Sequence, residues 1–319
     1  MPTYPERIAG GLWGLLVGDA VGVPYEFHAP HDLPPHDLLD ITPPAGFRRA
    51  HAGVPAGTWS DDGAQALALL ASLLERGMLD LDDLGRRLVA WYETGYLAVD
   101  GVVFDVGVQT GQAIRALRAG APAHAAGPDH EHANGNGSLM RVLPLALWHR
   151  GSDAELVRDA HAQSLVTHGH LRAQVCCALY CLWARRTLHA APDPWGEAVV
   201  TLRTIYGSTS PAYAELERQI RPDDPPQGSG SGYVVDCLRS ARLALAAGAY
   251  EDVVRAAIAL GHDTDTTACV AGGIAGIRDG VGAIPARWMR QLRGRDLVEP
   301  LLQRLLRHIG GEGAAAPAV

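Results

Sequence analysis

The amino-acid sequence predicts an all-α fold. Alanine and leucine dominate its apolar residues and only 6% of the residues are aromatic, a composition that favours helix over strand. Apolar residues recur at spacings of three and four in several segments, whereas alternating patterns typical of strands are scarce. We therefore expect about ten to thirteen helices packed against one another.

The chain has 319 residues, 47% of them hydrophobic and 19% charged, which is typical of a globular protein with a large core. At about 150 residues per domain, this length allows two domains or one large one. No shift in composition marks a linker and no repeat recurs at a fixed period, so we expect one domain over residues 1–309 and a disordered tail over residues 310–319. The net charge of −8 argues against general nucleic-acid binding.

The N-terminal segment superficially resembles a signal peptide, because Arg7 precedes an apolar run over residues 8–17. Asp19 and Glu26 follow closely and no cleavage site is evident, so we interpret the run as the first core helix. It is also shorter than the roughly 20 apolar residues of a membrane span. The five cysteines are odd in number and lie in apolar helical segments, which predicts reduced, buried thiols. We expect a cytoplasmic protein without a membrane partner.

Helical periodicity is clear in four further segments: residues 67–74, 84–92, 157–165 and 250–258. The acidic residues 80–83 suit the N-terminus of the second of these helices. Ser152 and Glu155 form a capping box before the third, and Gly261 ends the fourth. Loops rich in Pro, His and Gly separate the helices, notably residues 29–57 and 121–137.

Two acidic segments stand at helix entrances. Ser60 can cap a helix whose first turn then contains Asp61 and Asp62. In the second segment, Asp263 and Asp265 are two residues apart and Thr266 adds a hydroxyl group. The simpler explanation is that these acids only complement helix dipoles, which contributes about 0.3 to 1 kcal/mol each. Because hard divalent cations prefer about six oxygen ligands, four carboxylates and two hydroxyls from both segments could instead hold two ions.

An ordered set of short motifs resembles the ADP-ribosylglycohydrolase family over most of the chain. The motifs are Gly18-Asp19-Ala20 with Glu26, Trp59-Ser60-Asp61-Asp62, Asp105-Val106-Gly107 with Gln109-Thr110, residues 134–141 (NGNGSLMR) with Pro144, Thr167-His168, Gly232-Tyr233-Val234, and residues 263–267 (DTDTT) with Gly272-Gly273. Each motif alone is weak, but their order is specific.

The resemblance implies an all-α bundle around a binuclear Mg²⁺ or Mn²⁺ site in a cleft, with Glu26 beside the metals. The implied metal ligands are Ser60, Asp61, Asp62, Asp263, Asp265 and Thr266. Ser60 stands where the family usually has threonine, which keeps the oxygen. Gly63 stands where threonine is common. Neither departure removes a ligand.

The reaction implied is hydrolysis of the bond between ADP-ribose and its acceptor at the distal ribose, through a transition state with oxocarbenium character. A carboxylate must handle a proton, and Glu26 and Asp105 are the candidates, in either order of roles. The partner would be an ADP-ribosylated protein or other macromolecule, with ADP-ribose as product. The sequence leaves the linkage open, and we expect a monomer.

Further residues are expected to bind the substrate. They are Gly107, Gly135, Asn136, Gly137, Ser138, His168 and Tyr233. Residues 135–138 precede a helix expected over residues 139–148, where backbone N–H groups can cradle a diphosphate, although a plain loop and cap is the alternative. Residues 29–57 and 121–134 are expected to form the rim of the cleft.

Three alternatives remain at this point. His124, His130, Glu131 and His132 offer ligands for zinc, but their spacing matches no zinc motif. His262-Asp263 imitates the HD pair of metal phosphohydrolases, which would place His262 on the metal. The third alternative is a protein of the same fold that binds ADP-ribose without hydrolysing it.

Overall fold

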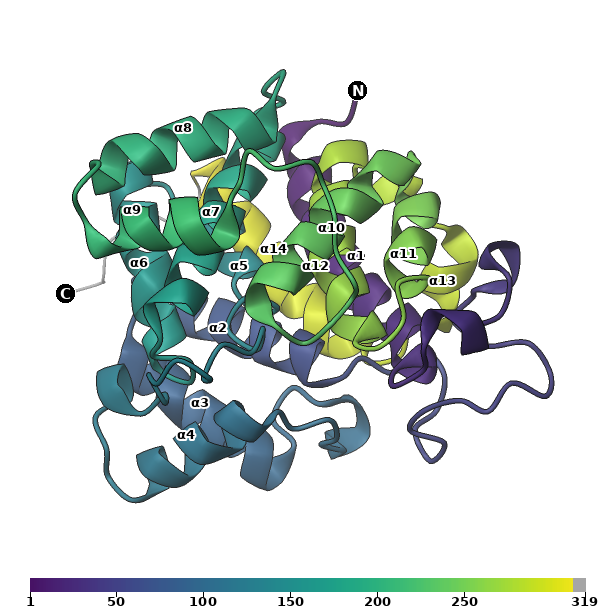
Figure 1. Cartoon of the computed structure of the whole chain (residues 1–319). Helices are drawn as coiled ribbons and strands as arrows, with labels where there is room; N and C mark the ends of the chain where they lie inside the picture. Colours follow the sequence, from purple (N-terminus) through teal and green to yellow (C-terminus); the bar gives the residue numbers. More distant parts are fainter. Residues whose placement is uncertain (312–319) are drawn as a thin grey trace.

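The computed structural model describes residues 1–311, and the fold there is entirely helical (Figure 1), as the composition predicts. The α-helices are α1 Tyr4–Gly22, α2 Asp61–Arg76, α3 Leu81–Thr94, α4 Val108–Arg118, α5 Leu143–Trp148, α6 Asp153–Leu165, α7 Leu171–Leu188, α8 Pro194–Tyr206, α9 Pro211–Glu215, α10 Val234–Ala244, α11 Tyr250–Ile258, α12 Thr264–Asp279, α13 Ala286–Gln291 and α14 Arg295–Gly310. Short helical turns are η1 Val23–Tyr25, η2 Pro30–Asp32, η3 His36–Leu38, η4 Val99–Gly101, η5 Ala123–Ala125, η6 Leu216–Ile220, η7 Leu245–Ala247 and η8 Val281–Ala283. Within residues 1–311 there is no strand, only one isolated bridge between Gly135 and Tyr233.

The amphipathic helices lie where their periodicity predicts. Ser60 caps α2, and Ser152 with Glu155 forms the capping box of α6. The count of helices was wrong, since the described chain has more than thirteen; α5, α9 and α13 have only five or six residues and show no periodicity of their own. The helix expected from residue 139 begins at Leu143, because residues 139–142 form turns and Pro144 occupies the first helical turn.

The helices α1 and α12 pack backbone against backbone at the middle of the bundle (Figure 1). A methyl group on Gly276 would lie 2.0 Å from the carbonyl oxygen of Gly10, and one on Gly14 would lie 2.4 Å from that of Gly272. The contact between the two helices continues to the end of α1 and the start of α12, where the Thr264 hydroxyl donates to the carbonyl of Gly22 at 2.8 Å. The two ends of the chain therefore meet, which positions residues near 20 and 265 together.

We expect Gly276→Ala to destabilise the protein by about 1 to 3 kcal/mol, as overpacking does. Alanine favours helix by about 1 kcal/mol over glycine. The added methyl group, however, would clash with backbone that cannot rotate away, so we expect the net change in stability to be a loss. Thermal unfolding measures the effect. Gly282→Ala is the control, because a methyl group there meets nothing within 4 Å. Equal melting temperatures for the two variants would contradict this packing.

The first helix is a core element. The segment Tyr4–Tyr25 is long and apolar enough to cross a membrane, but its apolar window is wholly buried inside the bundle. All five cysteines are free and buried, as predicted. Of the tail predicted as disordered, Gly310 ends α14 and Gly311 caps it, and residues 312–319 lie outside the described part of the chain. The domain bounds of 1–309 stay a prediction.

Candidate active site

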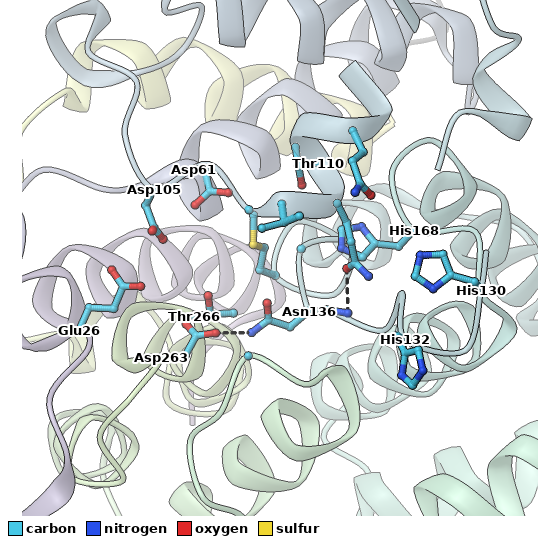
Figure 2. Close-up of a pocket in the computed structure, with 18 residues that line it drawn as sticks. Glu26, Asp61, Asp105, Thr110, His130, His132, Asn136, His168, Asp263 and Thr266 are labelled. Atoms are coloured by element: carbon cyan, nitrogen blue, oxygen red, sulfur yellow. Dashed lines mark hydrogen bonds between the residues drawn. The ribbon is translucent and has the colours of Figure 1, made fainter. Parts of the chain in front are cut away.

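A cavity of about 460 Å³ opens where α2 and α12 begin (Figure 2). Glu26 follows η1, Asp61 lies in the first turn of α2, and Asp105 comes from the loop before α4. Asp263 and Thr266, at the start of α12, complete the acidic end. The structure thus brings together the two acidic segments that lie 200 residues apart, as expected from the sequence.

Asp19 holds the start of α2 against α1. Its carboxylate accepts the backbone N–H of Ser60 at 2.9 Å and that of Gly63 at 2.8 Å, and it is fully buried. Ser60 Oγ in turn accepts the N–H of Asp62 at 3.3 Å. Asp19 belongs to one of the sequence motifs, but no role is assigned to it from the sequence. Its place inside an apolar helical run is the signal that could have identified it as a functional residue.

The buried carboxylates form two overlapping groups. Oxygen atoms of Asp19, Asp62 and Asp265 lie within 4.8 Å of one another, as do those of Glu26, Asp263 and Asp265. Asp265 belongs to both groups.

These residues fit a divalent cation. One oxygen each of Asp62 and Asp265 (Oδ2) is buried without a hydrogen-bond partner, although Thr266 Oγ1 donates to the other oxygen of Asp62 at 3.2 Å. Unpartnered buried carboxylate oxygens are costly unless a cation balances them. Ser60, Asp62 and Asp265 lie beneath the cavity lining, whereas Asp61, Asp263 and Thr266 face it.

Burial and mutual repulsion raise the pKa values of these acids. Burial raises the pKa of Glu26 to about 10, with Asp105 and Asp263 adding to the effect. Burial likewise raises the pKa of Asp19 to about 7 and that of Asp105 to about 6, and it raises the pKa of Asp265 well above the usual range. Without a cation, the folded protein therefore retains protons on Glu26 and Asp265 at neutral pH.

This proton retention predicts how the stability of the metal-free protein depends on pH. Between pH 7 and pH 8 the unfolded state has released the Glu26 proton and the folded state holds it, so stability falls as pH rises, by about 1.4 kcal/mol per unit for one such group. We expect a lower melting temperature at pH 8 than at pH 7, and a smaller difference with saturating Mg²⁺ or Mn²⁺. A metal-free protein that is more stable at pH 8 would contradict this charge balance.

The opposite end of the cavity is formed by residues 135–137 and His168 (Figure 2). The N–H of Gly135 donates to Gln109 Oε1 at 2.9 Å, and a methyl group on Gly137 would lie 2.8 Å from the His168 ring. Asn136 Nδ2 donates to Asp263 Oδ2 at 2.8 Å, which ties this loop to the acidic end.

His168 lines the cavity with a neutral imidazole. Burial, with a contribution from Arg141, lowers its pKa to about 3, so the ring is neutral. Arg141 donates to the Thr167 hydroxyl at 2.6 Å, and that oxygen lies 2.8 Å from His168 Nδ1. Since the Thr167 oxygen already accepts from Arg141, we assign its hydroxyl group as the donor to Nδ1 of His168, and the ring then carries its own proton on Nε2.

Two residues that were expected to bind the substrate do not line the cavity. The Ser138 side chain is fully buried and accepts from the Ser164 hydroxyl at 2.8 Å, so it does not face the cavity. Tyr233 caps α10 and its hydroxyl accepts from Arg172 at 3.3 Å; its neighbour Gly232 lines the cavity instead. Gly107, Gly135, Asn136, Gly137 and His168 all line it.

The histidines considered as metal ligands lie apart from the acidic groups. His130 and His132 line the cavity on the side of His168 (Figure 2). His262 is exposed, and in residues 1–311 no group of candidate ligands contains it. The HD-type alternative needs His262 on the metal and is therefore not supported.

The sequence and the structure are similar to known proteins. A family model described as ADP-ribosylglycohydrolase matches residues 1–315. The chain is 32% identical to the ADP-ribosylarginine hydrolase Tri1 of Pseudomonas putida, over 94% of this chain and 78% of that protein. It is 27% identical to the ADP-ribosyl-[dinitrogen reductase] glycohydrolase of Rhodospirillum rubrum, over 91% and 92%. A solved structure described as an ADP-ribosylglycohydrolase-related protein complex matches with a TM-score of 0.77 and 31% identity, over 97% of this chain and 99% of that one.

Proposed function

This chain belongs to the ADP-ribosylglycohydrolase family and is a metal-dependent hydrolase that removes ADP-ribose from ADP-ribosylated targets, and we propose that the bond it cleaves joins ADP-ribose to an arginine side chain. The observation that carries the proposal is the difference between the two ends of the cavity. Glu26 and Asp105 offer carboxylates at one end, whereas His168 and the loop 135–137 line the other. The N–H groups of Gly135 and Asn136 are bonded to Gln109 Oε1 and to the carbonyl of Gly232, so the donors we propose there are the imidazole of His168 and the N–H of Gly137. Carboxylates bind a guanidinium strongly, and N–H groups suit a diphosphate.

The protein's own residues account for binding. In our proposal the Nε2–H of His168 donates to a diphosphate oxygen, and Asp105 accepts from the guanidinium of the leaving arginine. Asp105 lies at positive φ (53°) on its loop, a conformation that aspartate tolerates better than most residues. The similarity to the ADP-ribosylarginine hydrolase Tri1 supports the same assignment.

Hydrolysis moves one proton from the attacking water to the leaving group. The C1″–N bond breaks with its electron pair on nitrogen, so the charged guanidinium leaves as a neutral guanidine. The oxygen of water bonds to C1″, and we assign to Glu26 the proton that this water loses, because its carboxylate lies beside Asp263 and Asp265. The proton then returns the guanidine to its charged form.

We propose that two Mg²⁺ or Mn²⁺ ions are held by Ser60, Asp61, Asp62, Asp263, Asp265 and Thr266. When bound they supply positive charge that orients the ribose hydroxyls and polarises a water molecule. The buried, unpartnered oxygens of Asp62 and Asp265 support this assignment.

A panel of substrates tests the linkage. Purified protein with Mg²⁺ or Mn²⁺ is incubated with Arg-, Ser-, O-acetyl- and nucleic-acid-linked ADP-ribose, and free ADP-ribose is measured. We expect release from the arginine linkage at least about tenfold faster than from the others, since leaving buried polar groups unpaired costs more than 1.4 kcal/mol. Faster release from another linkage would overturn the proposal. Tight binding of ADP-ribose without any release would instead favour a binding protein.

We further propose that the enzyme acts as a monomer in the cytoplasm on an ADP-ribosylated protein. The cavity is formed by one chain, and five buried free thiols suit a reducing compartment. Light scattering of the purified protein tests the monomer.

A further inference from the structure

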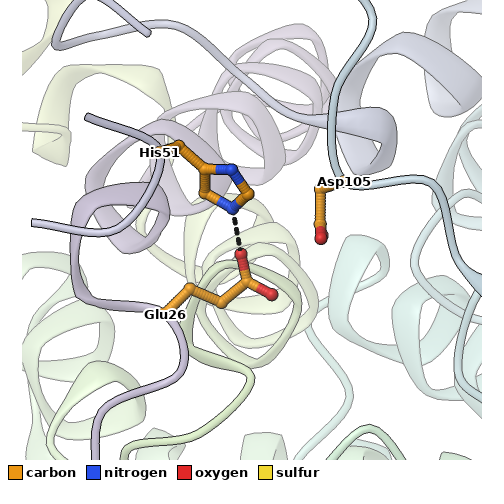
Figure 3. A group of neighbouring side chains, drawn as sticks. All are labelled: Glu26, His51 and Asp105. Carbon is orange, nitrogen blue, oxygen red and sulfur yellow. Dashed lines mark hydrogen bonds and ion pairs between the residues drawn. The ribbon is translucent and has the colours of Figure 1, made fainter. Parts of the chain in front are cut away.

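A histidine holds the carboxylate of Glu26. His51 Nε2 lies 2.6 Å from Glu26 Oε2, and both side chains are largely buried, with 16% and 5% exposed. Figure 3 shows the second oxygen of Glu26 pointing away from the imidazole, on the side where Asp105 lies. His51 itself is not among the residues that line the cavity.

Two aromatic rings lie beside the imidazole. The Phe27 ring lies 5.5 Å from it between centroids, and the Phe104 ring lies 5.0 Å from it. Phe27 is the neighbour of Glu26 in the chain, and Phe104 is the neighbour of Asp105. The two rings beside the imidazole therefore come from the same two segments that carry the two carboxylates.

The backbone of residue 51 is fixed as well. The N–H of Ala50 donates to the carbonyl of Pro24 at 2.9 Å, and the carbonyl of His51 accepts from Val54 at 2.8 Å. His51 has a φ of 48°, in the left-handed region that a residue with a Cβ occupies only when its surroundings hold it there. The loop between η3 and α2 thus delivers this one side chain to Glu26.

Glu26 needs such a partner because its other neighbours repel it. Oxygens of Asp263 and Asp265 lie within 4.8 Å of its carboxylate, and one of Asp105 lies within 4.8 Å on another side. Like charges disfavour a fixed carboxylate in this place, whereas an N–H donor restrains it.

We propose that His51 is a positioning residue for the hydrolysis: its Nε2–H donates to Oε2 of Glu26 and keeps the other oxygen free to take the proton of water. The proposal rests on the role assigned to Glu26 above. His51 neither touches the substrate nor transfers a proton in this scheme.

Two variants separate the donor from the ring. His51→Phe keeps an aromatic ring between Phe27 and Phe104 but removes the N–H, and His51→Gln keeps an N–H donor without the ring. We expect His51→Phe to lower kcat by about 10- to 100-fold with KM little changed, as loss of such supporting partners does. His51→Gln should recover most of that loss. His31→Phe is the matched control, because His31 lies in the nearby η2 with 83% of its side chain exposed.

These variants are assayed with whichever substrate the wild type cleaves fastest. Their kcat values therefore test His51 even if the bond cleaved is not the arginine linkage. Wild-type kcat in a folded His51→Phe protein would overturn the proposal, and so would an equal loss in His51→Phe and His51→Gln. If phenylalanine prevents folding, His51→Leu removes the same donor with less volume.

Comparison with Glu26→Gln separates this proposal from the proposed function. We expect His51→Phe to cause no further loss when added to Glu26→Gln, because His51 acts through that carboxylate. A fully active Glu26→Gln variant would overturn both the role of Glu26 and that of His51. An inactive Glu26→Gln beside a fully active His51→Phe would overturn the positioning role alone.

Discussion

Asp265→Asn is expected to abolish the release of ADP-ribose, lowering kcat/KM by on the order of 10³-fold or more. Asp265 is the one residue common to both groups of carboxylates, it is fully buried, and its Oδ2 atom has no hydrogen-bond partner. Asparagine has nearly the same shape, and its oxygen can still accept the N–H of Thr266 as Oδ1 does at 2.8 Å. The variant therefore removes a charge from the cation site and little else.

The stability of the same variant distinguishes a cation site from a structural cluster. Without metal, Asp265 must take up a proton when it is buried, because burial raises its pKa well above the usual range. Asparagine avoids that cost, so we expect a melting temperature equal to or above that of the wild type. With Mg²⁺ or Mn²⁺, the wild type should gain stability and the variant should not. The control is Asp279→Asn, at the far end of the same helix, where Asp279 pairs with Arg278. An active variant, or one that unfolds without metal, would contradict this assignment.

Glu26→Gln is expected to lower kcat by about 10²- to 10⁴-fold, the usual range for loss of a group that moves a proton. Glutamine keeps the size of the side chain and can still bond to His51, but it cannot take a proton from water. The affinity for ADP-ribose should stay near that of the wild type, because the groups proposed to bind the diphosphate lie at the other end of the cavity.

Parallel measurements of turnover and of ADP-ribose binding by calorimetry check this division of roles. A Glu26→Gln variant that loses affinity and keeps its kcat would assign Glu26 to binding instead. Asp105→Asn supplies the comparison, since the sequence alone allowed the two acids to exchange roles; a larger loss of kcat there would reverse the assignment.

The regular part of the fold was predictable because its signals are local. The helices α2, α6 and α11 were found from apolar spacing and from caps that lie within a few residues of the helix they begin or end. The helix α5 was expected four residues too early. Residues 139–142 satisfy their hydrogen bonds in turns, and the buried Arg141 side chain bonds to Gln163 and Thr167, contacts that no local pattern contains.

The acidic end of the site was predictable for the same reason. Asp61 and Asp62 are neighbours in the chain, as are Asp265 and Thr266, so each half of the cluster is visible locally. The contacts of Glu26 with His51 and of Asn136 with Asp263 join residues 25 and 127 positions apart, and only the packed fold creates them. The burial of the Ser138 side chain in the core was also not visible in its motif.

Removal and return of the metal tests the central claim most directly. The protein is stripped of divalent cations by chelation and dialysis, and the release of ADP-ribose from ADP-ribosylarginine is followed before and after Mg²⁺ or Mn²⁺ is added. We predict negligible release from the stripped protein and recovery of most of the original rate on addition of the cation. Hydrolysis at the full rate without any divalent cation would contradict the assignment of the buried carboxylates of α2 and α12 as a catalytic metal site.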